Sequence, residues 1–129
     1  MTSTREVITG PGVPPPLGHY SPGVRHRDTL YVAGQAGIDP ATGAAAGEDF
    51  DAQARQALRN LEAVLRAGGS APEHVLNVTV SCAEMGDFAA LNALFAEVWP
   101  VDPPARMTSQ VPLPLGLLIS IGCVAAVPA

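Results

Sequence analysis

Two amphipathic helical patterns constrain the fold of this chain more than any other feature. In residues 51–67, apolar side chains recur every three or four positions, so they share one face of a helix: Ala54, Ala57, Leu58, Leu61, Val64 and Leu65. Asp49 or Asp51 can cap the start of this helix. Residues 68 and 69 are glycines, which end it because glycine tolerates the left-handed conformation found after helices.

The second helical pattern follows Asp87 as its predicted cap and ends at Pro100. Its predicted buried stripe has five members: Phe88, Leu91, Leu94, Phe95 and Val98. Strands are expected at residues 30–33, 75–82, 106–111 and about 117–127, and the order includes one more strand before the first helix, to which no residues are assigned. The predicted order is therefore β, β, α, β, α, β, β.

This order predicts an α+β fold in which both helices pack on one face of a mixed sheet. The other face would stay exposed in a monomer. Because 47% of the residues are apolar, we expect other copies of the chain to cover that face. The length of 129 residues fits one domain, 1–129, in which the proline-containing residues 1–16 form an extended N-terminal arm or loop.

Charge and composition exclude several classes of partner. The net charge is −5, and phosphate binding needs a basic surface, so we expect no nucleic-acid partner. Residues 107–129 carry no charge, but Pro112, Pro114 and the Val, Ile and Gly content favour a buried strand over a membrane span. We expect no membrane partner, no signal peptide and a cytoplasmic location, with Cys82 and Cys123 as buried free thiols.

Common catalytic and cofactor motifs are missing. No glycine-rich nucleotide loop and no nucleophile elbow occurs in the sequence. The three histidines, His19, His26 and His74, lie far apart and share no ligand spacing with a cysteine, so no metal and no cofactor is expected. These patterns alone predict only a small α+β oligomer.

Several segments, in order along the chain, are similar to the motifs of one known protein family. Residues 17–24, LGHYSPGV, resemble IGPYSQAV, and residues 32–43, VAGQAGIDPATG, resemble TSGQIPLDPATG. Residues 52–61, AQARQALRNL, resemble AQTRQVLENL, and residues 85–92, MGDFAALN, resemble MNDFAAMN. Residues 104–106, PAR, match the start of a signature. Together these segments resemble the RidA/YjgF family of reactive-intermediate (enamine/imine) deaminases.

The resemblance implies a chorismate-mutase-like fold, a homotrimer whose sheets form a closed barrel, and active sites between subunits. It implies that Arg106 grips the substrate carboxylate, which suits a planar guanidinium; the alternative is a structural arginine paired with an acid. It places Tyr20, Gly34, Asn92 and Thr108 around the substrate. Each also has a structural interpretation: a core tyrosine, a turn glycine, a surface asparagine and a strand threonine.

One departure from the family puts the reaction in question. The family has IEIEAIA in its last strand, and its first glutamate is thought to activate water. Here residues 119–125 read ISIGCVA. An alignment with a one-residue deletion places Ser120 at that position, and a gapless alignment places Ile121 there; neither is a carboxylate. Ala33 also replaces the family's serine. A serine orients water but is a weak base, and His19 beside Tyr20 could relay protons.

We therefore expect hydrolysis of a small carboxylate-bearing enamine or imine to a 2-oxo acid and ammonia, with Arg106, Ser120 and Tyr20 as catalytic residues. Two alternatives stay open: an enzyme of this fold with changed chemistry (isomerisation, cyclisation or decarboxylation), or a non-catalytic trimer that binds small carboxylates.

Overall fold

The first amphipathic pattern forms helix α1 (Phe50–Ala67) in the computed structural model, which describes residues 4–129. Asp49, rather than Asp51, is the N-cap, and its side chain accepts a hydrogen bond from the backbone N–H of Ala52 (2.9 Å). At the other end, Gly69 adopts the left-handed conformation, with φ of 85°. Both ends of α1 therefore follow from local sequence signals.

Helix α2 (Phe88–Val98) lies at the second predicted position, with two corrections. Asp87 precedes the helix, but its side chain makes no capping hydrogen bond, because residues 85–87 already form a 3-10 turn that leads into α2. Phe88 is 40% exposed and Val98 is half-buried, so the buried stripe is narrower than predicted: Leu91, Leu94 and Phe95.

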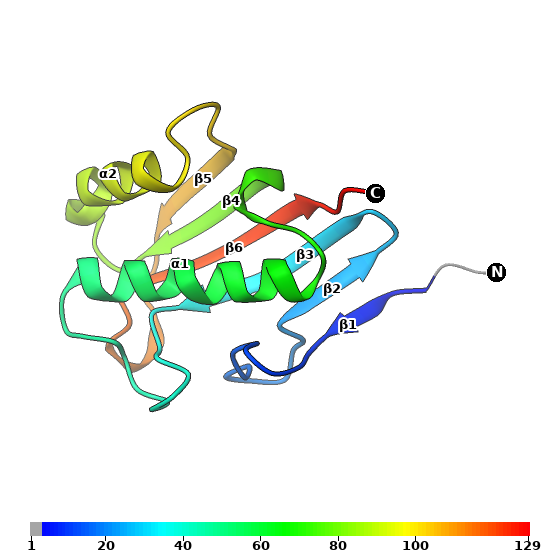
Figure 1. Ribbon diagram of the computed structural model, residues 1–129. Helices are drawn as coiled ribbons and strands as arrows, with labels where there is room; N and C mark the ends of the chain where they lie inside the picture. The colour runs from blue at the N-terminus through cyan, green and yellow to red at the C-terminus, as the bar shows by residue number, and fades with distance from the viewer. Residues whose placement is uncertain (1–3) are drawn as a thin grey trace.

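Six strands form one mixed sheet, and both helices cover the same face of it (Figure 1). The strands are β1 (Glu6–Ile8), β2 (Gly23–His26), β3 (Thr29–Ala36), β4 (Val75–Cys82), β5 (Ala105–Gln110) and β6 (Ile119–Ala126). Their order is β1-β2-β3-β6-β4-β5, in which β4 and β5 are parallel and every other neighbouring pair is antiparallel. The last strand, β6, thus lies in the middle of the sheet.

Strand β1 is a correction to the expected arm at residues 1–16, of which residues 1–3 lie outside the described part of the chain. Three residues carry too little alternation to predict a strand. Tertiary packing fixes β1: it pairs with β2, and Ile8 is buried beside Gly23, at a point where a larger residue would strike Val64.

The core lies between the sheet and the two helices. Alternate residues of β6 are buried, among them Ile119 and Ile121. They belong to one core cluster with fully buried residues of β3, β4 and α1: Leu30, Val64, Leu65, Val78 and Val80. Burial of each such side chain contributes on the order of 1.5–3 kcal/mol.

Among the described residues, no helix is both long and apolar enough to cross a bilayer.

The helix-free face of the sheet is uncharged. The pairing register places Val7, Val24, Tyr31, Val124 and Asn77 in one row across it. None of the strand residues that alternate onto this face in the described chain is Asp, Glu, Lys or Arg, and Tyr31 and Met107 are 52% and 66% exposed. Such a surface matches the predicted need for a covering partner.

Candidate functional site

Tyr20 lines a cavity of about 90 Å³, here called the Tyr20 cavity, at the end of β3. Its walls come from the proline-rich residues 14–17, residues 34–36 of β3, and Asn60 of α1, and none of its lining side chains is charged. The Tyr20 hydroxyl oxygen accepts a hydrogen bond from the backbone N–H of Leu17 (3.0 Å). Its own O–H proton stays available for donation, and the side chain is 46% exposed.

Gly34 and Ser120 are brought into contact, although 86 positions (120 minus 34) separate them. Gly34 lines the Tyr20 cavity. Ser120 lies on the neighbouring strand β6, where it pairs with Ala36 of β3. A Cβ atom at Gly34 would lie 2.5 Å from the Ser120 hydroxyl oxygen, so only glycine leaves this hydroxyl its place. The half-buried Ser120 therefore lies directly against Gly34, although its own side chain is not among those that line the cavity.

Two polar residues of α1 hold the loops around this cavity. Asn60, 4% exposed, donates to the backbone carbonyls of Ala36 (3.0 Å) and Ile38 (2.8 Å). Gln53, 2% exposed, donates to the Gly47 carbonyl (3.0 Å) and accepts from the Leu118 N–H (2.8 Å).

Sequence reasoning missed the roles of Gln53 and Asn60. They lie seven residues apart, or about two helical turns, among the apolar positions of α1. Their place on the apolar stripe of the helix was a signal that could have revealed these roles. A polar side chain that is buried there needs a hydrogen-bond partner in a neighbouring segment.

Arg106 lies on β5, on the helix side of the sheet, among residues of α2. Its guanidinium is 4.7 Å from the centre of the Phe95 ring and 5.4 Å from that of Phe88. It donates to the side-chain oxygen of Asn92 (2.6 Å), so the structure joins two of the predicted residues. Thr108 is half-buried two positions along the same strand.

Within residues 4–129, no carboxylate neutralises the charge of Arg106, because Arg106 forms no ion pair there. This argues against the alternative of an arginine paired with an acid. Aromatic rings and a neutral amide hold the half-buried guanidinium in place and leave its charge for an anion.

The Arg106 group and the Tyr20 cavity do not meet within one chain. Strands β4 and β6 lie between β5 and β3, so the two groups are three strand spacings apart, roughly 14 Å. His19 is exposed and does not line the Tyr20 cavity, so the structure gives no contact that supports it as a proton relay.

The two cysteines are buried and unpaired, as predicted. Burial raises the pKa of the Cys123 thiol to about 12. Burial also raises the pKa of the Cys82 thiol, with a further contribution from the negative charge of Asp87, while Arg106 acts in the opposite direction. Over residues 4–129, no group of three His, Cys, Asp or Glu side chains is placed to hold a metal ion.

Comparisons with known proteins agree with the fold. Residues 12–127 match the family described as Endoribonuclease L-PSP. A RutC family protein of Pyrococcus horikoshii is 39% identical over 94% of this chain and 97% of its own, and human 2-iminobutanoate/2-iminopropanoate deaminase is 35% identical over 94% and 89%. The crystal structure of RidA from an Antarctic Psychrobacter superposes with a TM-score of 0.89 at 34% identity, covering 94% of this chain and 98% of that one.

Proposed function

Because this chain belongs to the RidA/YjgF (endoribonuclease L-PSP) family, we propose that it hydrolyses a small carboxylate-bearing enamine or imine to a 2-oxo acid and ammonia. Arg106 is the observation that carries this proposal. A half-buried guanidinium with no acidic partner in the described residues is suited to a carboxylate, which it can bind through two parallel hydrogen bonds.

The proposed site is completed by a neighbouring copy of the chain in a homotrimer. Two features support this arrangement: the uncharged, partly apolar sheet face, which needs a cover, and the separation of Arg106 from the Tyr20 cavity within one chain. In this arrangement, Arg106, Asn92 and Thr108 of one subunit hold the substrate carboxylate. Tyr20, Gly34 and Ser120 of the next subunit surround its reacting carbon.

The proposed reaction needs only water as a co-reactant. An enamine first tautomerises to the imine, whose protonated C=N bond is the electrophile. The oxygen of water bonds to that carbon and water loses a proton, which gives a tetrahedral carbinolamine. A proton then reaches the nitrogen, the C–N bond breaks and ammonia leaves. The hydroxyl group loses its proton as the C=O bond of the 2-oxo acid forms.

Ser120 and Tyr20 have the groups that this sequence of steps requires. The Ser120 hydroxyl can orient the attacking water beside Gly34, and the Tyr20 O–H can donate a hydrogen bond to the substrate or the water. A serine is a weaker general base than a carboxylate, and such catalysis is worth about 10²–10⁴-fold in rate. We therefore expect a modest rate acceleration on imines that already hydrolyse slowly without help.

The absence of a carboxylate at position 120 also favours two other functions. A family member with changed chemistry (isomerisation, cyclisation or decarboxylation) would keep the Arg106 clamp and lose the water-activating group. A trimer that binds small carboxylates without turnover would do the same. Both alternatives predict carboxylate binding that depends on Arg106, and neither predicts imine hydrolysis.

The test generates imino acids in solution from several amino acids with an amino-acid oxidase and measures how fast the 2-oxo acid is released. We expect the protein to accelerate release, and Arg106→Gln to lower kcat/KM by about 10²-fold or more, because charge-assisted hydrogen bonds are lost. Arg66→Gln, which removes an exposed arginine of α1 that pairs with Glu62, is the matched control and should keep full activity.

Failure to accelerate any of these substrates would contradict the deaminase proposal. Calorimetry with pyruvate, a small 2-oxo acid, would then separate the alternatives. If pyruvate binds the wild type and not Arg106→Gln, the protein is a carboxylate-binding protein or an enzyme with changed chemistry. If pyruvate does not bind the wild type, Arg106 is not a carboxylate clamp in any of the three proposed functions.

A further inference from the structure

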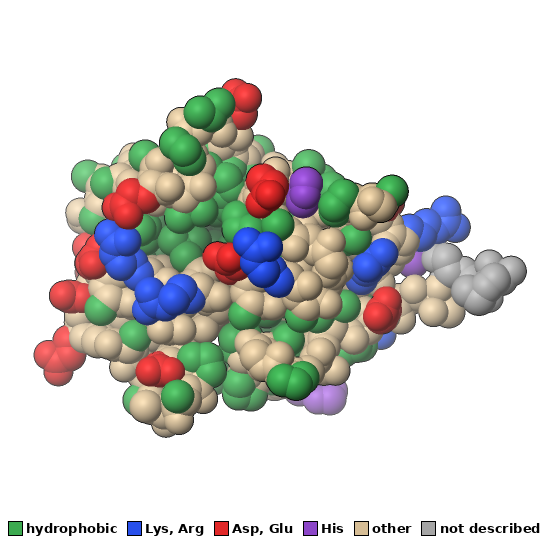
Figure 2. All heavy atoms as spheres, in the orientation of Figure 1, with side chains coloured by type: hydrophobic (Ala, Val, Ile, Leu, Met, Phe, Trp, Pro, Cys, Tyr) green, Lys and Arg blue, Asp and Glu red, His purple; other side chains and the backbone are tan. Residues whose placement is uncertain are grey.

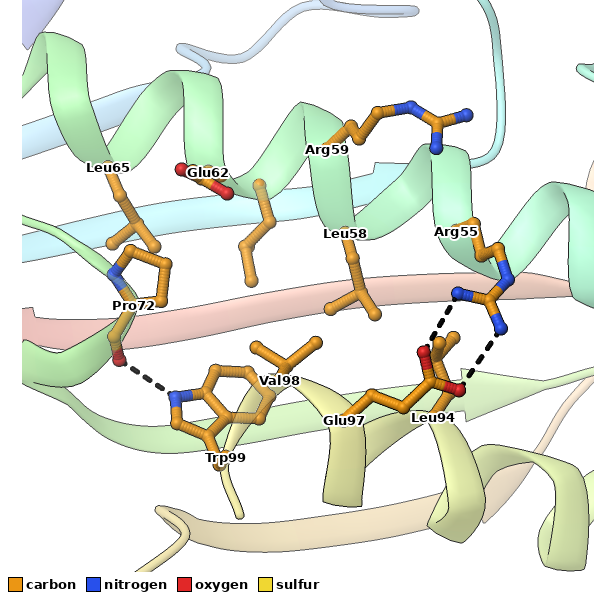
Figure 3. Close-up of a pocket in the computed structure, with 11 residues that line it drawn as sticks. Arg55, Leu58, Arg59, Glu62, Leu65, Pro72, Leu94, Glu97, Val98 and Trp99 are labelled. Atoms are coloured by element: carbon orange, nitrogen blue, oxygen red, sulfur yellow. Dashed lines mark hydrogen bonds and ion pairs between the residues drawn. The ribbon is translucent and has the colours of Figure 1, made fainter. Parts of the chain in front are cut away.

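A second and larger cavity, of about 280 Å³, lies between α1 and α2 on the helix side of the molecule (Figure 3). We name it the inter-helix groove. Apolar side chains form most of its surface: Leu58, Leu61, Leu65, Leu94, Val98 and Trp99. The indole N–H of Trp99 donates to the Pro72 carbonyl (2.8 Å), so the polar edge of the ring is satisfied, and the small exposed part of this buried side chain lines the groove.

Both ends of the groove are closed by polar contacts. At one end, Arg55 binds Glu97 through two parallel hydrogen bonds of 3.1 Å, and at the other the Trp99–Pro72 hydrogen bond joins the two walls (Figure 3). Leu58 projects into the space between these ends. The result is a short pocket with defined ends, which suits a small molecule better than an extended peptide.

Charge at the rim is unbalanced. Arg55 is neutralised by Asp51 and Glu97, whose hydrogen bonds raise the pKa of its guanidinium. Glu62 is paired with Arg66 at 2.8 Å. Arg59 is the exception: it is exposed, its hydrogen bond goes to the neutral amide oxygen of Gln56, and it forms no ion pair within residues 4–129.

We propose that the inter-helix groove binds a monocarboxylate with an apolar body, whose hydrocarbon part lies against Leu58 and Trp99 and whose carboxylate meets Arg59. The apolar floor and the single unpaired cation at the rim select this class over a cationic or zwitterionic ligand. A pocket of this volume holds roughly ten non-hydrogen atoms, given that a water occupies about 30 Å³ in the liquid.

Arg59 reaches this ligand through a change of rotamer. Its guanidinium now extends past the rim and away from the groove (Figure 3). Because the side chain is exposed and held by one neutral hydrogen bond, turning it back over Leu58 costs little. The carboxylate would replace the Gln56 amide as its partner and form the stronger, charge-assisted contact.

The groove is separate from the proposed deaminase site and lies on the face opposite the one that we expect other copies to cover. Its lining does not include Tyr20, Gly34, Arg106 or Ser120. An apolar hollow bordered by basic and acidic side chains is visible over the two helices in Figure 2, on the side opposite the uncharged sheet face. The binding proposal therefore stands or falls independently of the deaminase proposal.

Trp99 gives a direct readout, because it is the only tryptophan of the chain and lines the groove. The experiment titrates the full-length protein with octanoate and follows Trp99 emission. We expect a saturable change with a Kd on the order of 0.1–1 mM, which suits a ligand of about ten non-hydrogen atoms. Octylamine, which has the same hydrocarbon body and the opposite charge, should bind at least about five-fold more weakly.

Three variants complete the test. Arg59→Gln should weaken octanoate binding about five-fold, and Val98→Phe should abolish it by filling the groove. Arg66→Gln is the matched arginine control and should bind normally. Circular dichroism establishes that each variant is folded, and imine hydrolysis should be unchanged in Arg59→Gln.

No saturable change in Trp99 emission up to about 10 mM octanoate would overturn the proposal. Equal binding of octanoate and octylamine would also overturn it, as would an unchanged octanoate Kd in Arg59→Gln. In each case the groove would be only a packing feature of the two helices.

Discussion

Replacement of Gln53 by methionine should destabilise the protein more than its size suggests. Methionine is similar in length and shape but forms neither hydrogen bond, so it leaves the Gly47 carbonyl and the Leu118 N–H without their partner. Each unsatisfied buried group costs about 1–3 kcal/mol, and the apolar side chain recovers part of this by its own burial. We expect a net loss of about 3 kcal/mol in the free energy of unfolding.

Urea denaturation at one fixed protein concentration measures this loss, because oligomerisation makes stability depend on concentration. Far-UV circular dichroism is the probe, and the thermal midpoint should fall by roughly 10 °C. Gln110→Met is the matched control: its side chain also accepts a backbone hydrogen bond, from Met85, but it is exposed, so water can replace it. It should lose about 0.5 kcal/mol.

A loss below about 1 kcal/mol in Gln53→Met would refute the idea that this side chain holds the loops at residues 47 and 118. The same result would weaken the link between α1 and the candidate site, because residue 118 leads directly into the strand that carries Ser120.

The remaining predictions concern the glycines, the thiols and Ser120. Gly37→Ala should cost about 2 kcal/mol or more in unfolding free energy, because its Cβ would collide with the backbone of Gln53, whereas Gly86→Ala, with open space around it, should be nearly neutral in the same denaturation assay. Burial holds the pKa of the Cys123 thiol at about 12, above its ordinary value of 9.0. The protonated thiol therefore stabilises the folded state fully below pH 9, and this contribution is lost between pH 9 and 12. Denaturation at several pH values should show this fall in the free energy of unfolding, and Cys123→Ser should make the fall smaller. In the native protein at pH 8, a thiol reagent should label neither cysteine, and labelling without denaturant would contradict their burial. Ser120→Ala should lower kcat for imine hydrolysis about ten-fold, and an unchanged kcat would remove Ser120 from the mechanism.

Local signals predicted the helices and most strands well. Asp49 and Gly69 mark the two ends of α1, and residues 75–82 form β4 as expected, because these features depend on neighbouring residues alone. Strand β1 and the central place of β6 depend on contacts between distant segments, which periodicity does not contain.

The sequence supplied candidate site residues through the family resemblance, but not their arrangement. The resemblance to the family pointed to Arg106, Gly34 and Ser120, and the structure adds that Ser120 lies against Gly34. It also shows Asn92 as the hydrogen-bond partner of Arg106. That Arg106 lies far from Gly34 in the same chain follows from the order of the strands, which the sequence did not predict.

The claim that two copies of the chain share each catalytic site can be tested with mixed oligomers. Arg106→Gln removes the carboxylate clamp, and Gly34→Val displaces the Ser120 hydroxyl at a residue that lines the Tyr20 cavity. Each variant alone should be inactive. When equal amounts are unfolded together and refolded, a site between neighbouring subunits has both intact halves in about one case in four. We predict that the mixture recovers about a quarter of the wild-type imine-hydrolysis rate, and a mixture as inactive as its two components would contradict the shared site.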